Sequence, residues 1–276
     1  MKPLFYKLFI VGIAAFLIGG CNSATTSSEE NTSAATATQE VNPPAEEFNL
    51  VGSDQKAIKI ADEVMETMGG RVSWDTTRYL SWNFFGRRTL IWDKLENRVR
   101  IDMVDGSMSA ILDMNNMTGK VALNGVEQTE ADSVSKYLDR AKSTWINDSY
   151  WLVMPYKLKD SGVTLKYVRE DTTQTGASAD VLQLTFEKVG VTPENKYEVC
   201  VDKQSKLVTQ WAYYPSANDT TARFVTPWAK YEKKGAIMLS GDRGQFQLTD
   251  INVYAALPEE VFTSLNSVGL SNYSTL

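Results

Sequence analysis

The sequence of 276 residues contains no histidine. A Ser-His-Asp triad, a Cys-His pair and a His-ligated zinc ion are therefore excluded. Only two cysteines are present, Cys21 and Cys200, too few for a cysteine-rich metal site or a disulfide framework. Positive charge is also scarce, because 28 Lys and Arg face 34 Asp and Glu for a formal net charge of -6. A nucleic-acid binder needs a surplus of Lys and Arg to neutralise phosphates, so we expect no nucleic-acid partner.

Residues 1–20 have the pattern of a secretory signal peptide. Lys2 and Lys7 supply positive charge, and the apolar run from Leu8 to Gly20 has 13 residues, fewer than the roughly 20 of a membrane-spanning helix. The run ends in Leu17-Ile18-Gly19-Gly20-Cys21, which resembles the bacterial lipobox. That resemblance implies that Cys21 receives a diacylglycerol and becomes the mature N-terminus, with two or three acyl chains as a stable membrane anchor.

The expected location is therefore the bacterial cell envelope, with the protein lipid-anchored in the outer membrane and facing the periplasm or the cell surface. Residues 21–47 are predicted to be the lipidated cysteine and a disordered acidic linker, because residues 22–47 contain five Glu and no Lys, Arg or aromatic residue. Residues 48–276 hold all seven Trp and are predicted to form a single domain.

Helical periodicity recurs twice in this domain. Apolar residues from Ala57 to Met68 predict a first helix, which Ser53 or Asp54 can cap and which Gly69-Gly70 should end. A second helix is predicted over about residues 130–146, with Thr129 and Asp132 as its capping pair. Residues 258–265 can close the chain with a short third helix.

Alternating apolar residues predict strands through most of the remaining domain. Asp105-Gly106 is a strong two-residue hairpin signal, and a switch of apolar parity between Leu248 and Ile251 predicts a β-bulge. The fold class is mainly β (α+β), a large antiparallel sheet that these patterns allow to be a sandwich or an incompletely closed barrel. The predicted strands cover about residues 79–84, 90–92, 98–103, 108–114, 163–169, 181–187, 196–201, 207–213, 224–231, 236–239 and 245–254.

Several segments, in this order, resemble an uncharacterised family of bacterial lipoproteins and, more remotely, the lipoprotein-carrier superfamily of the LolA/LolB type. The similarity covers about residues 55–265 and implies a half-open β-barrel with two or three helices as a lid over an apolar hollow that accommodates acyl chains. Soluble carriers of that superfamily move freely, whereas this chain carries a predicted anchor, so cargo and role do not carry over. The segments are Met68-Gly69-Gly70, Trp74, Trp82, Ile91-Trp92-Asp93, Val99-Arg100-Ile101-Asp102, the run Tyr150 to Leu158 and the run Val201 to Leu207.

If such a barrel stays partly open, its inward side chains can line a ligand cavity. Methionine suits a surface that must accept varied acyl chains. The resulting hypothesis is a membrane-anchored lipoprotein that binds a lipid or another long apolar ligand. The alternative is a non-catalytic scaffold with a fully packed core and an exposed aromatic patch at Tyr213, Tyr214 and Trp228. The predicted cavity residues are Met65, Met68, Trp82, Phe84, Leu90, Trp92, Val99, Ile101, Met103, Leu112 and Met114.

No pattern indicates a catalytic, cofactor or metal site, and we expect a protein that is not an enzyme. Asp93, Asp102, Asp105 and Asp113 could meet as an acid pair or a hard-metal site, but turn and solvent-facing roles explain them better. Cys200 lies in a strand-like stretch without basic neighbours and is interpreted as a small buried apolar residue.

Overall fold

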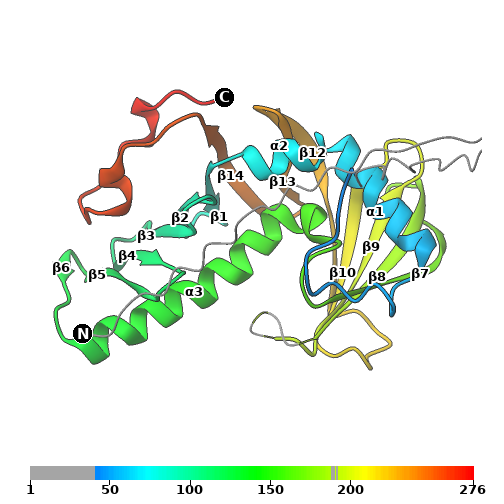
Figure 1. Cartoon of the computed structure of the whole chain (residues 1–276), viewed down its shortest axis with the longest axis horizontal. Helices are drawn as coiled ribbons and strands as arrows, with labels where there is room; N and C mark the ends of the chain where they lie inside the picture. Colours follow the sequence, from blue (N-terminus) through cyan, green and yellow to red (C-terminus); the bar gives the residue numbers. More distant parts are fainter. Residues whose placement is uncertain (1–40, 188–189, 191) are drawn as a thin grey trace, which may run out of the picture. The chain divides into compact units, whose positions relative to one another are not determined.

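The computed structural model describes residues 41–187, 190 and 192–276 (Figure 1). The predicted signal peptide, Cys21 and the linker up to residue 40 lie outside the described residues. Asn42, near the end of the predicted linker, is buried, and its side chain donates to Asp62 at 2.7 Å. The backbone amide of Ala45 donates to the carbonyl of Lys159 at 2.9 Å. The packed part of the chain thus begins a few residues before Phe48, because this segment pairs its backbone with the domain.

The larger of two antiparallel sheets has nine strands in the order β12-β13-β14-β1-β2-β3-β4-β5-β6. Strands β1 to β5 follow one another as neighbours, and Asp105-Gly106 lies in the turn between β3 and β4, which confirms the predicted hairpin. Strand bounds are β1 Tyr79–Phe84, β2 Arg88–Asp93, β3 Arg98–Met103, β4 Met108–Asp113, β5 Thr118–Leu123, β6 Val126–Glu127, β12 Ala229–Lys234, β13 Ile237–Arg243 and β14 Phe246–Tyr254.

The smaller sheet has five strands in the order β11-β10-β9-β8-β7. Only Trp228 separates β11 from β12, yet β11 pairs with β10 and β12 pairs with β13, so the chain passes directly from one sheet to the other. The two sheets form an open antiparallel half-barrel, which confirms the predicted fold class. Strand bounds are β7 Val163–Thr172, β8 Ser178–Phe186, β9 Lys196–Asp202, β10 Val208–Tyr214 and β11 Phe224–Pro227.

The predicted bulge is present in β14. Ser81 pairs with Asn252 and Asn83 pairs with Thr249, so β14 carries one residue more than β1 between these pairs. Asp250 lies within this stretch at a φ of +51°. The bulge explains why the apolar side chains of β14 change face along the strand.

Three α-helices accompany the sheets, α1 Gln55–Thr67, α2 Gly70–Thr76 and α3 Ala131–Val153, with the 3₁₀ helices η1 Met154–Lys157, η2 Glu259–Phe262 and η3 Leu270–Asn272. Helix α1 ends before Gly69, which has a φ of +112°, as the sequence predicts, and α2, which the sequence does not predict, begins at Gly70. The capping pair predicted for α3 is wrong, because Glu130 is the N-cap residue and no side chain caps this end. The helix also runs past Ile146 to Val153, because Leu152 and Val153 are buried and Pro155 is the first residue that cannot continue it.

Helix α3 lies along one face of the nine-stranded sheet and contacts β4, β5 and β13 (Figure 1). The side chains between them form the main core, with Trp82, Leu90 and Ile101 fully buried. On the opposite face, Tyr79, Ile91 and Tyr254 pack against the segment that follows β14. In the described part of the chain, no helix combines the length and apolar character required to cross a membrane.

Candidate functional site

A pocket of about 460 Å³ lies between the C-terminal part of α3 and the five-stranded sheet. This volume falls within the range typical of small-molecule sites. Eight of the 18 lining residues are aromatic, and Ile146 and Val163 are the aliphatic members. The aromatic lining residues are Trp145, Tyr150, Trp151, Phe186, Tyr197, Trp211, Tyr213 and Phe224. We call this cavity the aromatic pocket.

The sheet side of the aromatic pocket is built by strand register. Tyr197 of β9 pairs with Tyr213 of β10, which pairs in turn with Phe224 of β11. Three aromatic residues therefore stand side by side across neighbouring strands on one face. The ring centroids of Tyr197 and Tyr213 are 5.5 Å apart, and those of Tyr213 and Phe224 are 5.0 Å apart.

The helix side is fixed by contacts between α3 and this row of rings. Trp151 meets Trp211 edge to face, with centroids 4.9 Å apart at 82°, and Tyr150 lies 5.4 Å from Tyr197. Trp211 is anchored because its indole N–H donates to the hydroxyl of Thr226 at 2.5 Å. The rings therefore hold one another in a network that pre-forms the pocket.

Polar groups lie among the lining residues and outside the aromatic row. Lys157 and Asp160 form an ion pair, and the Tyr213 hydroxyl donates to Asn195 at 3.3 Å. Burial raises the pKa of Tyr197 to about 12 and the pKa of Tyr150 well above its usual value. These two phenols are therefore neutral near pH 7. A large apolar surface with a few polar groups suits an apolar or amphipathic ligand.

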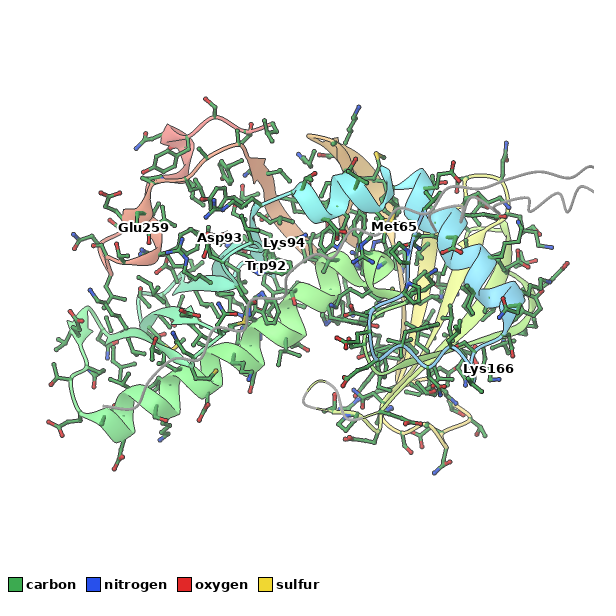
Figure 2. The ribbon with its side chains drawn as sticks, in the orientation of Figure 1. Met65, Trp92, Asp93, Lys94, Lys166 and Glu259 are labelled. Carbon is green, nitrogen blue, oxygen red and sulfur yellow. The ribbon has the colours of Figure 1, made fainter. Side chains whose placement is uncertain are left out.

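The residues predicted to line a cavity come together on one face of the nine-stranded sheet and on α1, but none of them lines the aromatic pocket. Trp82, Leu90, Val99, Ile101 and Leu112 are at most 1% exposed, and Met68, Phe84 and Trp92 are also buried. Trp92 points toward α3, where its ring lies 5.2 Å from Trp145 (Figure 2). Met114 packs against the same core at its edge.

Two of the predicted residues do line cavities. Met65, on α1 (Figure 2), lines a pocket of about 50 Å³, and Met103 lines one of about 220 Å³. The others fill space between the sheet and its helices, and contact of this predicted set with a ligand stays a prediction. Cys21 lies outside the described residues, and its lipidation also stays a prediction.

Sequence reasoning missed the aromatic pocket, for which the sequence shows only a concentration of aromatic residues on three predicted strands. Tyr197, Trp211, Tyr213 and Phe224 sit on predicted strands at positions that register brings to one face. The exposed patch imagined at Tyr213, Tyr214 and Trp228 is wrong, because Tyr214 is 8% and Trp228 1% exposed. Tyr213 instead lines the pocket, which also argues against a fully packed core.

The four aspartates considered as a catalytic group have separate partners. Asp93 accepts from Arg78 and Arg98, and Asp102 accepts from Arg100. Asp105 and Asp113 accept hydrogen bonds within their own turns. Among the described residues, no cluster of three or more His, Cys, Asp or Glu could hold a metal ion.

Cys200 is buried, as interpreted from the sequence, and burial raises the pKa of its thiol to about 11. A thiol that stays protonated near pH 7 is a poor nucleophile. Cys200 therefore contributes packing to the small cluster it forms with Ala179 and Val181.

Comparisons with known proteins give structural likenesses only. No family model and no curated protein matches the chain. A DUF1329 family protein from Desulfovibrio piger is 11% identical, and the match covers 75% of this chain and 97% of that chain with a TM-score of 0.41. An outer membrane lipoprotein-sorting protein domain from Vibrio parahaemolyticus is 10% identical over 75% and 96%, with a TM-score of 0.40. A LolA superfamily protein from Nitrosomonas europaea is 9% identical over 75% and 97%, with a TM-score of 0.34.

Proposed function

We propose that the protein is a non-catalytic lipoprotein of the cell envelope that binds a lipid or another long apolar ligand in the aromatic pocket. The observation that carries this proposal is a cavity of about 460 Å³ with eight aromatic side chains in its lining. Burying each methylene of a ligand in such a cavity contributes about 0.8 kcal/mol before the costs of association. Several methylenes suffice for measurable affinity, because the ring network is already in place in the unliganded protein.

The predicted anchor at Cys21 would place this pocket at a membrane that supplies apolar ligands. Labelling of cells with a radioactive or alkyne-bearing fatty acid tests the anchor, because the full-length protein should incorporate label and Cys21→Ser should not. The labelled protein should fractionate with the outer membrane. Equal labelling of both chains would overturn the anchor without affecting the ligand proposal.

Two measurements on the full-length chain test the ligand proposal. Organic extraction of the purified protein, followed by mass spectrometry, should recover a lipid or another long apolar molecule. Titration with the neutral fluorescent probe N-phenyl-1-naphthylamine should then give saturable binding that the extracted molecule displaces. Absence of both bound material and saturable probe binding would overturn the proposal.

A pair of variants on β11 assigns the binding to the aromatic pocket. Phe224→Ala removes a ring from the lining and should weaken probe binding about tenfold. Val225→Ala, on the next residue of the same strand, is the matched control, because Val225 is 38% exposed and does not line the pocket. Equal affinities for the two variants would place the probe elsewhere.

A further inference from the structure

A second cavity of about 220 Å³ lies at one end of the nine-stranded sheet and shares no lining residue with the aromatic pocket. Strands β2 to β5, with the turns after β3 and β5, supply one side, and the middle of α3 supplies the other. Its volume corresponds to roughly seven water molecules of the bulk liquid. The lining residues are Arg88, Met103, Ser107, Met108, Leu123, Asn124, Tyr137, Arg140 and Thr144, and we call this cavity the arginine pocket.

The formal charges in the lining of the arginine pocket are all positive. The lining contains two arginines and no carboxylate. The positive charge of Arg88 is neutralised by a residue outside the lining, because its Nε and Nη2 atoms donate to the fully buried Asp148 at 2.5 and 2.7 Å. The nearest acid in the turn between β3 and β4, Asp105, accepts from the amide and the hydroxyl of Ser107 and is not part of the lining.

Arg140 is the second arginine of the lining, and its positive charge is not neutralised. It lies on the exposed side of α3, and its guanidinium makes no hydrogen bond or ion pair with any residue that the structure describes. A guanidinium presents five N–H donors in a fixed planar arrangement that suits phosphate and carboxylate oxygens. Thr144, one helical turn further along α3, adds a hydroxyl to the same wall.

Three apolar side chains, Met103, Met108 and Leu123, form the floor of the pocket, and Ser107, Asn124 and Tyr137 complete the lining. Met108 is buried, while Met103 and Leu123 are partly buried and pack against the main core. Unbranched methionine side chains adapt to alkyl groups of different shape. A polar wall with one unpaired cation thus faces an apolar floor within a single small cavity.

We propose that the arginine pocket binds the head of an amphiphile that carries an oxyanion, with the head group on Arg140 and the first methylenes on Met103, Met108 and Leu123. The site is separate from the aromatic pocket and does not depend on the function proposed for it. A phosphate group of a lipid and a free phosphate ion share this head-group chemistry. Only an amphiphile uses both walls, so it should bind more tightly than the ion alone.

Calorimetric titration of the full-length protein with octyl phosphate, octanol and inorganic phosphate tests this proposal. Octyl phosphate should bind at least tenfold more tightly than either of the others. Equal binding of inorganic phosphate would overturn the role of the apolar floor. Equal binding of octanol would overturn the role of the oxyanion, and absence of octyl phosphate binding would overturn the site.

Arg140→Gln should weaken octyl phosphate binding at least tenfold and leave octanol binding unchanged. Lys142→Gln is the matched control, because it removes the same charge from an exposed position two residues along α3 that does not line the pocket. Equal losses in the two variants would show a general effect of charge and overturn the assignment to Arg140. Both positions are exposed, so thermal unfolding should confirm that each variant folds. Binding of the neutral probe N-phenyl-1-naphthylamine should be unaffected by Arg140→Gln, which separates failure of this site from failure of the aromatic pocket.

Discussion

Arg88 on β2 and Asp148 on α3 form an ion pair that ties the long helix to the nine-stranded sheet between the two pockets. Two parallel hydrogen bonds of 2.5 and 2.7 Å join them, and the Asp148 side chain is fully buried. Arg88 lines the arginine pocket, while Asn147 and Ser149, the neighbours of Asp148, line the aromatic pocket. Burial raises the pKa of Asp148 although Arg88 opposes this effect.

Removal of one partner of this ion pair should lower protein stability more than replacement of both partners by apolar residues. We expect Asp148→Ala to lower the free energy of unfolding by about 3 kcal/mol, because Arg88 then loses its counter-charge in a poorly solvated site. The double variant Arg88→Met/Asp148→Leu should recover most of this loss. Urea unfolding of the single and double variants measures both effects. A loss below 1 kcal/mol in Asp148→Ala would contradict the interpretation.

Gly69 and Gly70 offer a matched pair for testing close packing beside α1. Gly69 has a φ of +112°, and a Cβ atom there would lie 2.3 Å from the carbonyl oxygen of Ala236. Gly70 has a φ of +85° and open space at the same position. Gly69→Ala should therefore cost well over 2 kcal/mol of unfolding free energy, whereas Gly70→Ala should cost about 1 kcal/mol from backbone strain alone. Similar losses at the two positions would refute the close contact.

Arg100 fixes the segment that follows β14 to the outer face of the sheet. Its side chain is 1% exposed and donates to the carbonyls of Ser264 at 2.7 Å and Asn266 at 2.8 Å. Arg100→Met removes these bonds and leaves carbonyl groups without partners, so stability should fall by about 2–3 kcal/mol. Hydrogen exchange followed by mass spectrometry should show faster exchange in the segment after β14.

Lys120 supplies the control for this prediction. Its ammonium group is exposed and donates to the carbonyl of Thr263 at 2.8 Å, in the same segment. Lys120→Met should change exchange and stability little, because water replaces an exposed hydrogen bond readily. Equal effects of Lys120→Met and Arg100→Met would show that burial of Arg100 is not what holds the segment.

Local periodicity predicts the antiparallel strands and much of the core, whereas the half-open barrel is what the resemblance to the lipoprotein carriers implies. Alternation along β3 and β4 places Val99, Ile101 and Leu112 on one face, and the structure buries all three. The aromatic pocket depends instead on the register of β9, β10 and β11, which decides that Tyr197, Tyr213 and Phe224 stand together. Nothing local in the sequence specifies that register.

The C-terminal end of α3 is a second feature that local sequence patterns do not predict. The run from Tyr150 to Met154 lacks a clear helical period because both sides of the helix are covered there: Tyr150 faces the aromatic pocket, while Leu152 and Val153 are buried. Apolar periodicity identifies a helix that has one solvent-exposed face. It does not identify a helical segment that is buried on all sides. The predicted helix therefore ends at about residue 146, before the residues that place Trp151 over the five-stranded sheet.

Lys94 has the environment of a partly desolvated amine. Its Nζ atom donates to the carbonyl of Trp74 at 2.7 Å and lies 3.9 Å from the centre of the Trp74 ring and 6.0 Å from that of Trp92 (Figure 2). Burial lowers the pKa of Lys94 from 10.5 to about 8. Folding therefore disfavours the charged form, and below pH 8 the folded protein carries that cost in full. Between pH 8 and 10.5, the unfolded chain holds a proton on this amine that the folded protein has lost, so the contribution of Lys94 to stability rises with pH.

Comparison of the wild-type chain with Lys94→Met isolates this contribution from every other titrating group. The variant should gain stability relative to wild type at pH 7, because no charge remains to be desolvated, and the advantage should shrink by about 1 kcal/mol by pH 10 after allowance for partial exposure of the amine. Urea unfolding at the two pH values gives the difference. Labelling of Lys94 by an amine-reactive reagent should rise with a midpoint near pH 8, since only the neutral amine reacts. A stability difference that stays constant over this range, or a labelling midpoint near 10.5, would show that Lys94 is as well solvated in the folded protein as in the unfolded chain.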